Sequence, residues 1–191
     1  GPASIDVAQD KTLNYGGADL EIGAHLLTLR GGGVLNSANA LKLNQIGGLV
    51  QLDGINEINA PLELTGGALK AAESAVLRGV LSLSGPSTVE VALQKKLSYQ
   101  GGSLTLGIHS LEIKGEGEFD FTVPQAALVL DETNSLLLLS GSGRIPRVLV
   151  RATPADDRGL QITGQPSLIA LEFEVDASLS VSDRFSVEEG I

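Results

Sequence analysis

Hydrophobic residues in this chain alternate with polar residues over very short stretches, and turn-forming residues separate the stretches. Triplets of the type leucine, any residue, aliphatic residue recur along the sequence, at 20–22, 27–29, 41–43, 62–64, 81–83 and 104–106. Such alternation over about three residues is typical of a short β-strand with one buried face. Glycine, asparagine, aspartate and serine fill the gaps and favour tight turns. The pattern therefore predicts many short strands joined by turns.

These triplets recur with a constant spacing, at every twenty-first position of the chain. One column contains Leu20, Leu41, Leu62, Leu83 and Leu104, and after a short insertion it resumes at Leu128 and Leu149. Two further columns with this period are Leu13, Val34, Ile55, Val76 and Leu97, and Leu29, Val50, Ala71, Ala92 and Ile113. A fixed period of this size is typical of a solenoid, in which each repeat packs on the next. We therefore expect an all-β fold, a right-handed parallel β-helix of about eight coils, with the columns as buried ladders.

A longer duplication covers four of these coils. Residues 7–33 align without a gap to residues 91–117, and twelve positions are identical, including both tyrosines and both histidines of the chain. The offset between the two segments equals four of the periods described above, so a duplication of this length preserves the stacking of coils. We expect one β-solenoid domain over 1–191, with the duplicated unit at 5–87 and 88–167. Residues 168–191 would form an irregular last coil or a cap.

Two other folds could produce parts of this pattern. Two immunoglobulin-like sandwiches, each as long as the duplicated unit, would need longer strands and usually a buried Trp or Tyr. A coiled coil is excluded because the repeats are rich in glycine and β-branched residues. A narrow solenoid interior favours leucine and valine, so we expect large aromatic side chains to fit it poorly, and only 3% of residues are aromatic. The open strand edges expected at the ends of such a stack predict that this chain is a segment of a longer array.

Composition narrows the range of functions. The chain has 13 Lys and Arg against 23 Asp and Glu, for a net charge of −10. This balance argues against nucleic-acid binding, which depends on clustered positive charge. The absence of cysteine removes disulfides and thiolate chemistry. No apolar run approaches the roughly 20 residues of a membrane-spanning helix, so we expect no membrane span.

Few residues are arranged for chemistry. His25 and His109 occupy equivalent positions four coils apart, about 19 Å along a stack, so they cannot share a metal ion. We expect both to be polar turn residues, and we expect Tyr15 and Tyr99 to cover a turn or a coil edge. No motif for a metal, phosphate or organic cofactor is present, and we predict none. Outward-facing Glu21, Lys42 and Glu63 predict a charge ladder along one face.

One cluster could still bind or catalyse. Asp156, Asp157 and Arg158 form the only tight group of acidic and basic residues, in a proline-containing segment. They are the weak candidates for a binding site, and we predict no catalytic residue. Segments such as 101–117 (GGSLTLGIHSLEIKGEG) resemble the β-solenoid stretches of large bacterial surface proteins, including adhesin stalks and filamentous-haemagglutinin-like passengers.

This resemblance implies an extracellular, non-enzymatic structural or adhesive module whose partners are a surface glycan, another protein or adjoining repeats. The fold is also similar to that of pectin-lyase-like polysaccharide-degrading enzymes, in which outward carboxylates with Lys or Arg carry the reaction. That resemblance would place the chemistry at residues 156–158. Bactofilin-like filament-forming proteins share the fold style and provide an intracellular alternative.

Overall fold

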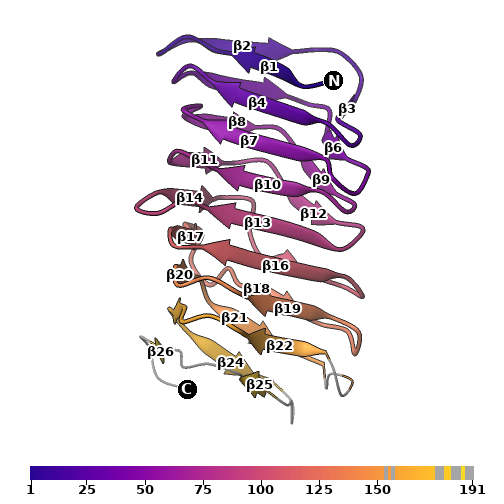
Figure 1. The fold of residues 1–191 in the computed structure, drawn as a ribbon, viewed down its shortest axis with the longest axis vertical. Helices are drawn as coiled ribbons and strands as arrows, with labels where there is room; N and C mark the ends of the chain where they lie inside the picture. The colour runs from indigo at the N-terminus through magenta and orange to yellow at the C-terminus, as the bar shows by residue number, and fades with distance from the viewer. Residues whose placement is uncertain (153–154, 156–157, 175–178, 182–185, 188–191) are drawn as a thin grey trace.

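The chain folds as a parallel β-solenoid, as the sequence predicts (Figure 1). The computed structural model describes all residues except 153–154, 156–157, 175–178, 182–185 and 188–191. Every regular element among the described residues is a β-strand, and neighbouring strands pair in parallel. The described part of the chain contains no helix that could cross a membrane.

Four sheets run along the axis of the solenoid. Sheet A contains β1 (Ala3–Asp6), β4 (Leu26–Arg30), β7 (Leu49–Asp53), β10 (Ala68–Ala71), β13 (Ser87–Val91), β16 (Ser110–Gly115), β19 (Leu136–Leu139), β22 (Gly159–Ile162) and β25 (Leu179–Val181). Sheet B contains β2 (Thr12–Tyr15), β5 (Val34–Ser37), β8 (Glu57–Asn59), β11 (Ala75–Leu77), β14 (Lys96–Tyr99), β17 (Glu118–Phe121), β20 (Arg144–Ile145), β23 (Ser167–Leu168) and β26 (Ser186–Val187).

The third side of the solenoid is divided into two shorter sheets. Sheet C contains β3 (Leu20–Glu21), β6 (Leu41–Leu43), β9 (Leu62–Leu64) and β12 (Leu81–Leu83). Sheet D contains β15 (Leu104–Thr105), β18 (Leu128–Leu130), β21 (Val148–Val150) and β24 (Leu171–Phe173). Strands β1 to β24 therefore form eight successive trios, one strand per side, close to the coil number that the sequence predicts.

The length of one coil varies along the stack. Thr65 and Ser84, whose hydroxyls meet across two successive coils of the third side, are 19 residues apart in sequence. Glu118 and Arg144, which pair in successive strands of sheet B, are 26 residues apart. The strands stack at a constant spacing of about 4.8 Å, so the turns absorb the difference in length. The constant period expected from the sequence is therefore wrong in detail, although the coil architecture is right.

The variable coil length changes which residues form the buried ladders. Leu20, Leu41 and Leu62 do stack on one another. The next partner of Leu62, however, is Leu81, and Leu83 stacks on Leu64 instead. Leu83 and Leu20 are only partly buried, and Leu149 lies outward between the buried Val148 and Val150. The columns predicted from Leu13 and Leu29 drift in the same way.

In the Leu13 column, Leu13 pairs with Leu35 rather than Val34, and the ladder continues through Ile58 and Leu77. In the Leu29 column, Leu29 pairs with Leu52 rather than Val50, although both are fully buried. Counting with a fixed period can therefore reach a different inward-facing residue of the next strand from the one that actually pairs. This happens because inward-facing residues of a strand are two positions apart. In the Leu29 column Val50, Ala71 and Ile113 are buried as predicted, whereas Ala92 is only half-buried and follows the end of β13.

Aromatic side chains do enter the interior, contrary to the expectation from composition. Tyr99 and Phe119 are fully buried, and the Phe121 ring lies against both, with centroid separations of 5.4 Å to Tyr99 and 5.6 Å to Phe119. The aromatic cluster lies beside the level at which the third side passes from sheet C to sheet D. The three rings therefore pack together in the interior, next to the change from sheet C to sheet D.

Tyr99 also completes the hydrogen bonding at this break. In β3, β6, β9, β15, β18 and β21, the amide of the first residue donates to a carbonyl of the next coil, as Leu62 N–H does to Val80 O at 2.8 Å. Leu81 begins the last strand of sheet C, and its N–H donates to the Tyr99 hydroxyl at 2.9 Å instead. The phenol oxygen thus replaces a missing ladder carbonyl, so the prediction that Tyr99 covers a turn or coil edge is wrong.

The duplicated segments fold alike. Strands β1 to β4 correspond to β13 to β16 at the offset of the duplication, four trios further along the stack. Gly31 and Gly115 have φ of 100° and 102°, and a Cβ at these glycines would lie 2.4 Å from Val7 O and 2.1 Å from Val91 O. Only glycine accommodates both the positive φ and the close approach. Beyond the second unit, β24, β25 and β26 continue sheets D, A and B.

Candidate functional site

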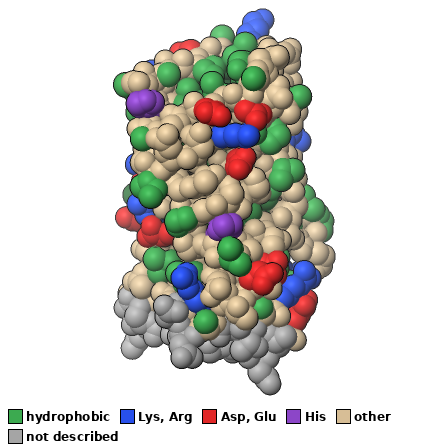
Figure 2. Space-filling view, turned by 90° about the vertical axis from the view of Figure 1, so that its right-hand side faces the viewer, with side chains coloured by type: hydrophobic (Ala, Val, Ile, Leu, Met, Phe, Trp, Pro, Cys, Tyr) green, Lys and Arg blue, Asp and Glu red, His purple; other side chains and the backbone are tan. Residues whose placement is uncertain are grey.

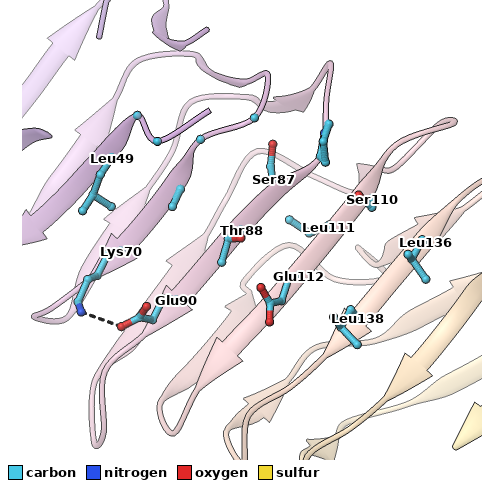
Figure 3. A pocket seen from close by; sticks show the side chains of 16 residues that line it. Leu49, Lys70, Ser87, Thr88, Glu90, Ser110, Leu111, Glu112, Leu136 and Leu138 are labelled. Atoms are coloured by element: carbon cyan, nitrogen blue, oxygen red, sulfur yellow. Dashed lines mark ion pairs between the residues drawn. The ribbon is translucent and has the colours of Figure 1, made fainter. Parts of the chain in front are cut away.

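A groove with a volume of about 580 Å³ lies on the outer surface of sheet A (Figure 3). It crosses strands β7, β10, β13, β16 and β19. Its rim on the turn side contains the pairs Gly47-Gly48 and Gly66-Gly67 together with Pro86. Five consecutive coils therefore contribute to one continuous surface.

The depth of the groove follows from the sizes of stacked outward residues. One outward column reads Leu49, Ala68, Thr88, Glu112 and Leu138 in consecutive strands. Ala68 and Thr88 are small, and Ser87 and Ser110 flank them, whereas leucines stand at both ends. Because each coil adds about 4.8 Å, a run of small residues over successive coils produces a depression between two apolar ends.

Charged side chains line one side of the groove. Lys70 Nζ lies 2.7 Å from Glu90 Oε1 (Figure 3). Lys114 Nζ lies 3.6 Å from Glu90 Oε2. The hydrogen bond from Lys70 lowers the pKa of Glu90 below its usual value, with further lowering by the charges of Lys70 and Lys114. Glu90 is therefore a carboxylate at neutral pH and can accept hydrogen bonds, but it does not hold a proton to donate.

Glu112 is also engaged by the protein itself. The hydroxyl of Ser140, just after the next strand of sheet A, donates to Glu112 Oε1 at 2.5 Å. The groove thus offers small hydroxyls, apolar patches and carboxylate side chains that are held in place. This combination suits recognition of an extended, hydroxyl-bearing or polar chain along the axis.

A second, smaller cavity of about 380 Å³ lies at the corner after sheet B. It is lined by Pro124, Gln125, Pro146, Arg147 and Glu172 among others. The Arg147 guanidinium donates to Gln125 and Glu172, and its buried Nε has no hydrogen-bond partner within the described residues. Because Glu172 already neutralises Arg147 at 26% side-chain exposure, this corner offers little net charge to an anion.

The cluster proposed from sequence is only partly described. Asp156 and Asp157 lie outside the described residues. Arg158 is half-buried immediately before β22, and its backbone N–H donates to Ala155 O at 2.9 Å. Arg158 does not line the groove on sheet A.

The two histidines occupy equivalent turns that precede β4 and β16. His25 is exposed and His109 is half-buried, and their backbone carbonyls accept from Leu49 N–H and Leu136 N–H of the next coil. Figure 2 shows the two imidazoles well apart on the surface of the solenoid. Within the described residues, no group of three or more His, Cys, Asp or Glu side chains could hold a metal ion.

The predicted ladder of Glu21, Lys42 and Glu63 is present in the register of sheet C. Lys42 Nζ lies 3.9 Å from Glu63 and 2.7 Å from Asp19, so Asp19 is its closer partner. The hydrogen bond that Lys42 donates to Asp19 raises the pKa of Lys42. This ladder links three coils on the exterior.

Sequence reasoning missed the groove. Its residues carry no catalytic motif, and the relevant signal is a run of small outward residues in consecutive coils. Comparison of the chain with protein-family models, curated proteins and solved structures finds no significant match. The fold itself assigns the chain to the class of parallel β-solenoids.

Proposed function

We propose that this chain is a non-enzymatic structural or adhesive module of an extracellular bacterial surface protein. It acts as a rigid stalk, and the groove on sheet A provides the surface on which a glycan or another protein binds. The observation that carries the proposal is the continuous pairing of nine strands in each of sheets A and B. Uninterrupted parallel pairing along the axis gives a rod whose length, rather than a single pocket, is its main property.

The use of the outward carboxylates supports a structural role. Glu57 is paired with Arg78 at 2.7 Å, Asp120 with Lys96 at 2.6 Å and Glu90 with Lys70 at 2.7 Å, and each pair joins two coils. Each exposed pair contributes less than about 1 kcal/mol, but together they fix the outer surface. Carboxylates held in this way stabilise the rod and are poorly placed for proton transfer.

The proposed location rests on composition and resemblance. A net charge of −10 keeps a long rod soluble and disfavours binding to nucleic acid. A chain without cysteine is compatible with oxidising surroundings. The Leu-rich, Gly-punctuated coils are those that resemble bacterial surface solenoids.

Polysaccharide turnover tests the proposal against the pectin-lyase-like alternative. The purified chain is incubated with acidic and neutral polysaccharides, and unsaturated products and reducing ends are measured. We expect no turnover. Turnover abolished by Asp157→Ala would establish the enzyme instead.

Binding to the groove is tested with a matched pair of variants on a glycan array. Thr88→Trp fills the groove, whereas Ser82→Trp places the same side chain on an exposed position of β12. We expect at least a tenfold loss of glycan binding, about 1.4 kcal/mol, for Thr88→Trp alone. Equal binding by both variants would remove the groove from the proposal.

A further inference from the structure

We infer that the corner between β17 and β18, residues 122–127, forms one wall of a binding site for the ring of a neutral sugar. The inference goes beyond the proposed function, whose groove lies on sheet A, because this second cavity lies at the corner after sheet B. It rests on a comparison of the two duplicated units, since only the second has a corner of this length.

The two units differ in length at this corner. In the first unit, β5 ends at Ser37 and β6 begins at Leu41, so three residues connect the strands. In the second unit, β17 ends at Phe121 and β18 begins at Leu128, so six residues connect them. The three additional residues are the insertion that shifts the leucine column between Leu104 and Leu128. The insertion therefore falls in a single corner and leaves the strands on either side of it unchanged in order.

The long corner shares a cavity with two short ones. The corresponding corners of the next two coils are 146–147, between β20 and β21, and 169–170, between β23 and β24. Residues of all three corners line the cavity of about 380 Å³. This volume lies within the range of about 300–1,000 Å³ that is typical of small-molecule sites. The insertion thus adds a wall to a cavity of suitable size for a small ligand.

The inserted corner contains a tight turn with an unusual residue. Ala126 N–H donates to Val123 O at 3.1 Å, with Pro124 at the second position of the turn and Gln125 at the third. Gln125 has φ of 66°, a conformation for which such turns normally use glycine. Its side chain lines the cavity and accepts a hydrogen bond from Arg147. We attribute the glutamine at this strained position to the contacts of its side chain.

Phe121 gives the cavity an aromatic wall. Its ring contacts the rings of Tyr99 and Phe119, with centroid separations of 5.4 and 5.6 Å, and it also lines the cavity. Ser37 occupies the equivalent position of the first unit. Further apolar lining comes from Pro124, Pro146 and Ile169. Because its neighbours already hold the Phe121 ring, a ligand that packs on it loses little affinity to ordering of the side chain.

The charged groups of the cavity balance one another. The Arg147 guanidinium pairs with Glu172, and Lys96 Nζ lies 2.6 Å from Asp120 Oδ2. Each of these carboxylates has a cationic partner, so a charged ligand gains no net attraction at the site. Guanidinium and carboxylate groups each have several hydrogen-bonding positions. Both kinds of group can therefore bind a ligand hydroxyl in addition to their protein partner.

A neutral pyranose ring fits this combination of groups. Its C–H face is apolar and suits the Phe121 ring, whereas each of its hydroxyls can both donate and accept a hydrogen bond. Such a hydroxyl would donate to Asp120 or Glu172 and accept from Arg147. An anionic ligand would bring its charge beside the two carboxylates and a cationic ligand beside the guanidinium, and like charges oppose binding. The site therefore favours a neutral sugar over a charged one.

Amide chemical shifts of the intact chain test the inference. The probes are the methyl pyranosides of glucose, galactose and mannose, each titrated to about 50 mM because a ligand of this size should have a Kd of about 1–10 mM. We expect saturable shifts at the amides of residues 122–127 and of Arg147. No saturable shift with any of the three probes, or shifts confined to sheet A, would overturn the inference. Galacturonate and glucosamine should bind at least about fivefold more weakly, and equal or tighter binding of either would contradict the neutral class.

A matched pair of glycine variants tests the role of the corner. Gln125→Gly gives the turn its ordinary residue, so the fold should be retained while the side chain leaves the cavity. Gln94→Gly is the control, because Gln94 also has a positive φ, of 59°, is exposed and does not line the cavity. We expect the Kd to rise at least about fivefold for Gln125→Gly and to stay unchanged for Gln94→Gly. The same Kd in both variants would contradict the assigned contact.

Two further variants separate this site from the groove. Thr88→Trp fills the groove on sheet A and should leave the Kd of the methyl pyranosides unchanged. A loss of their binding in Thr88→Trp would assign the sugar to the groove instead. Replacement of residues 122–127 by the sequence of residues 38–40 restores the short corner of the first unit and should abolish binding. Amide spectra report whether this replacement folds, and binding that persists in the folded protein would overturn the inference.

Discussion

The coils at 7–33 and 91–117 share twelve identical residues, yet one lies at an end of the solenoid and the other in its middle. Leu13 and Leu97, or Tyr15 and Tyr99, have similar neighbours in sequence and the same backbone. Their burial differs because only the second coil has another described coil on its N-terminal side. The importance of a residue in a solenoid therefore depends on its level in the stack. Matched substitutions at equivalent positions can test this directly.

The largest difference is expected for a charge placed on the inward leucines. Leu97→Asp puts a carboxylate in the apolar interior without a partner and should destabilise the fold by about 4 kcal/mol or more. Leu13→Asp leaves its carboxylate near solvent and should cost about 1 kcal/mol. Denaturant unfolding measures the loss of stability in the two variants. Equal losses would show that the end coil is as closed as the middle one.

The second largest difference in stability is expected for alanine substitutions at the glycines under the two tyrosine rings. Gly101→Ala forces a Cβ into the buried Tyr99 ring, which cannot move, and should cost about 2–3 kcal/mol. The ring of Tyr15 is partly exposed and can shift, so Gly17→Ala should cost less than about 1 kcal/mol. Thermal unfolding of the two variants checks the order, and a larger effect at Gly17 would refute the argument.

Removal of one hydroxyl should have a smaller effect. Tyr99→Phe leaves the Leu81 N–H buried without an acceptor and should cost about 1–2 kcal/mol. Tyr15→Phe should change the free energy of unfolding by less than about 0.3 kcal/mol. Amide exchange at Leu81 provides a local readout, since its protection should fall in Tyr99→Phe and stay unchanged in Tyr15→Phe. Unchanged protection of the Leu81 amide in both variants would argue against Tyr99 as its hydrogen-bond acceptor.

The same hydroxyl gives a pH dependence. Burial raises the pKa of Tyr99, with the hydrogen bond from Leu81 opposing it. A raised pKa means that the stabilising, protonated phenol is fully present below about pH 10 and is lost as the pH rises through the folded-state pKa. The stability advantage of the wild type over Tyr99→Phe should therefore shrink above about pH 10. An advantage that stays constant as the phenol ionises would contradict this assignment.

The smallest effect is expected at the outer carboxylates. Glu90 contacts Lys70 of the coil above, whereas its equivalent Asp6 has no described coil above it. Glu90→Gln should cost about 0.5 kcal/mol at neutral pH, and Asp6→Asn less. Because the pKa of Glu90 is lowered, its contribution is present above about pH 4.5 and is lost as the pH falls through the folded-state value. Urea unfolding at neutral and at strongly acidic pH measures the difference, which should vanish at the lower pH.

The fold was accessible from sequence because hydrophobic periodicity reports burial directly. The triplets at Leu41, Leu62 and Leu81 mark strands in the structure. The stacking partner of each strand residue could not be predicted in the same way. The register of Leu83 and the orientation of Leu149 depend on turn lengths, which the triplets do not encode. The burial of Tyr99 was missed because an average composition does not show where along the stack an individual ring packs.

The groove shows a different limit. Nothing in the sequence distinguishes Ala68 and Thr88 from other outward-facing residues. They form the bottom of the groove because the strand register makes them neighbours on β10 and β13. A register drawn with the fixed period of the sequence would pair Ala68 with Val89 and would miss the depression. The candidate cluster at 156–158, in contrast, was selected by its charge, which identifies no geometry by itself.

The unequal coil lengths have a mechanical consequence. Inter-coil hydrogen bonds run along the axis, so a force applied to the two termini would peel the rod from an end, one coil after another. A coil of 19 to 26 residues would release about 65–90 Å of extended chain. Single-molecule stretching should therefore give a series of small extensions of unequal size, and each extension would identify by its length the coil that had just unwound.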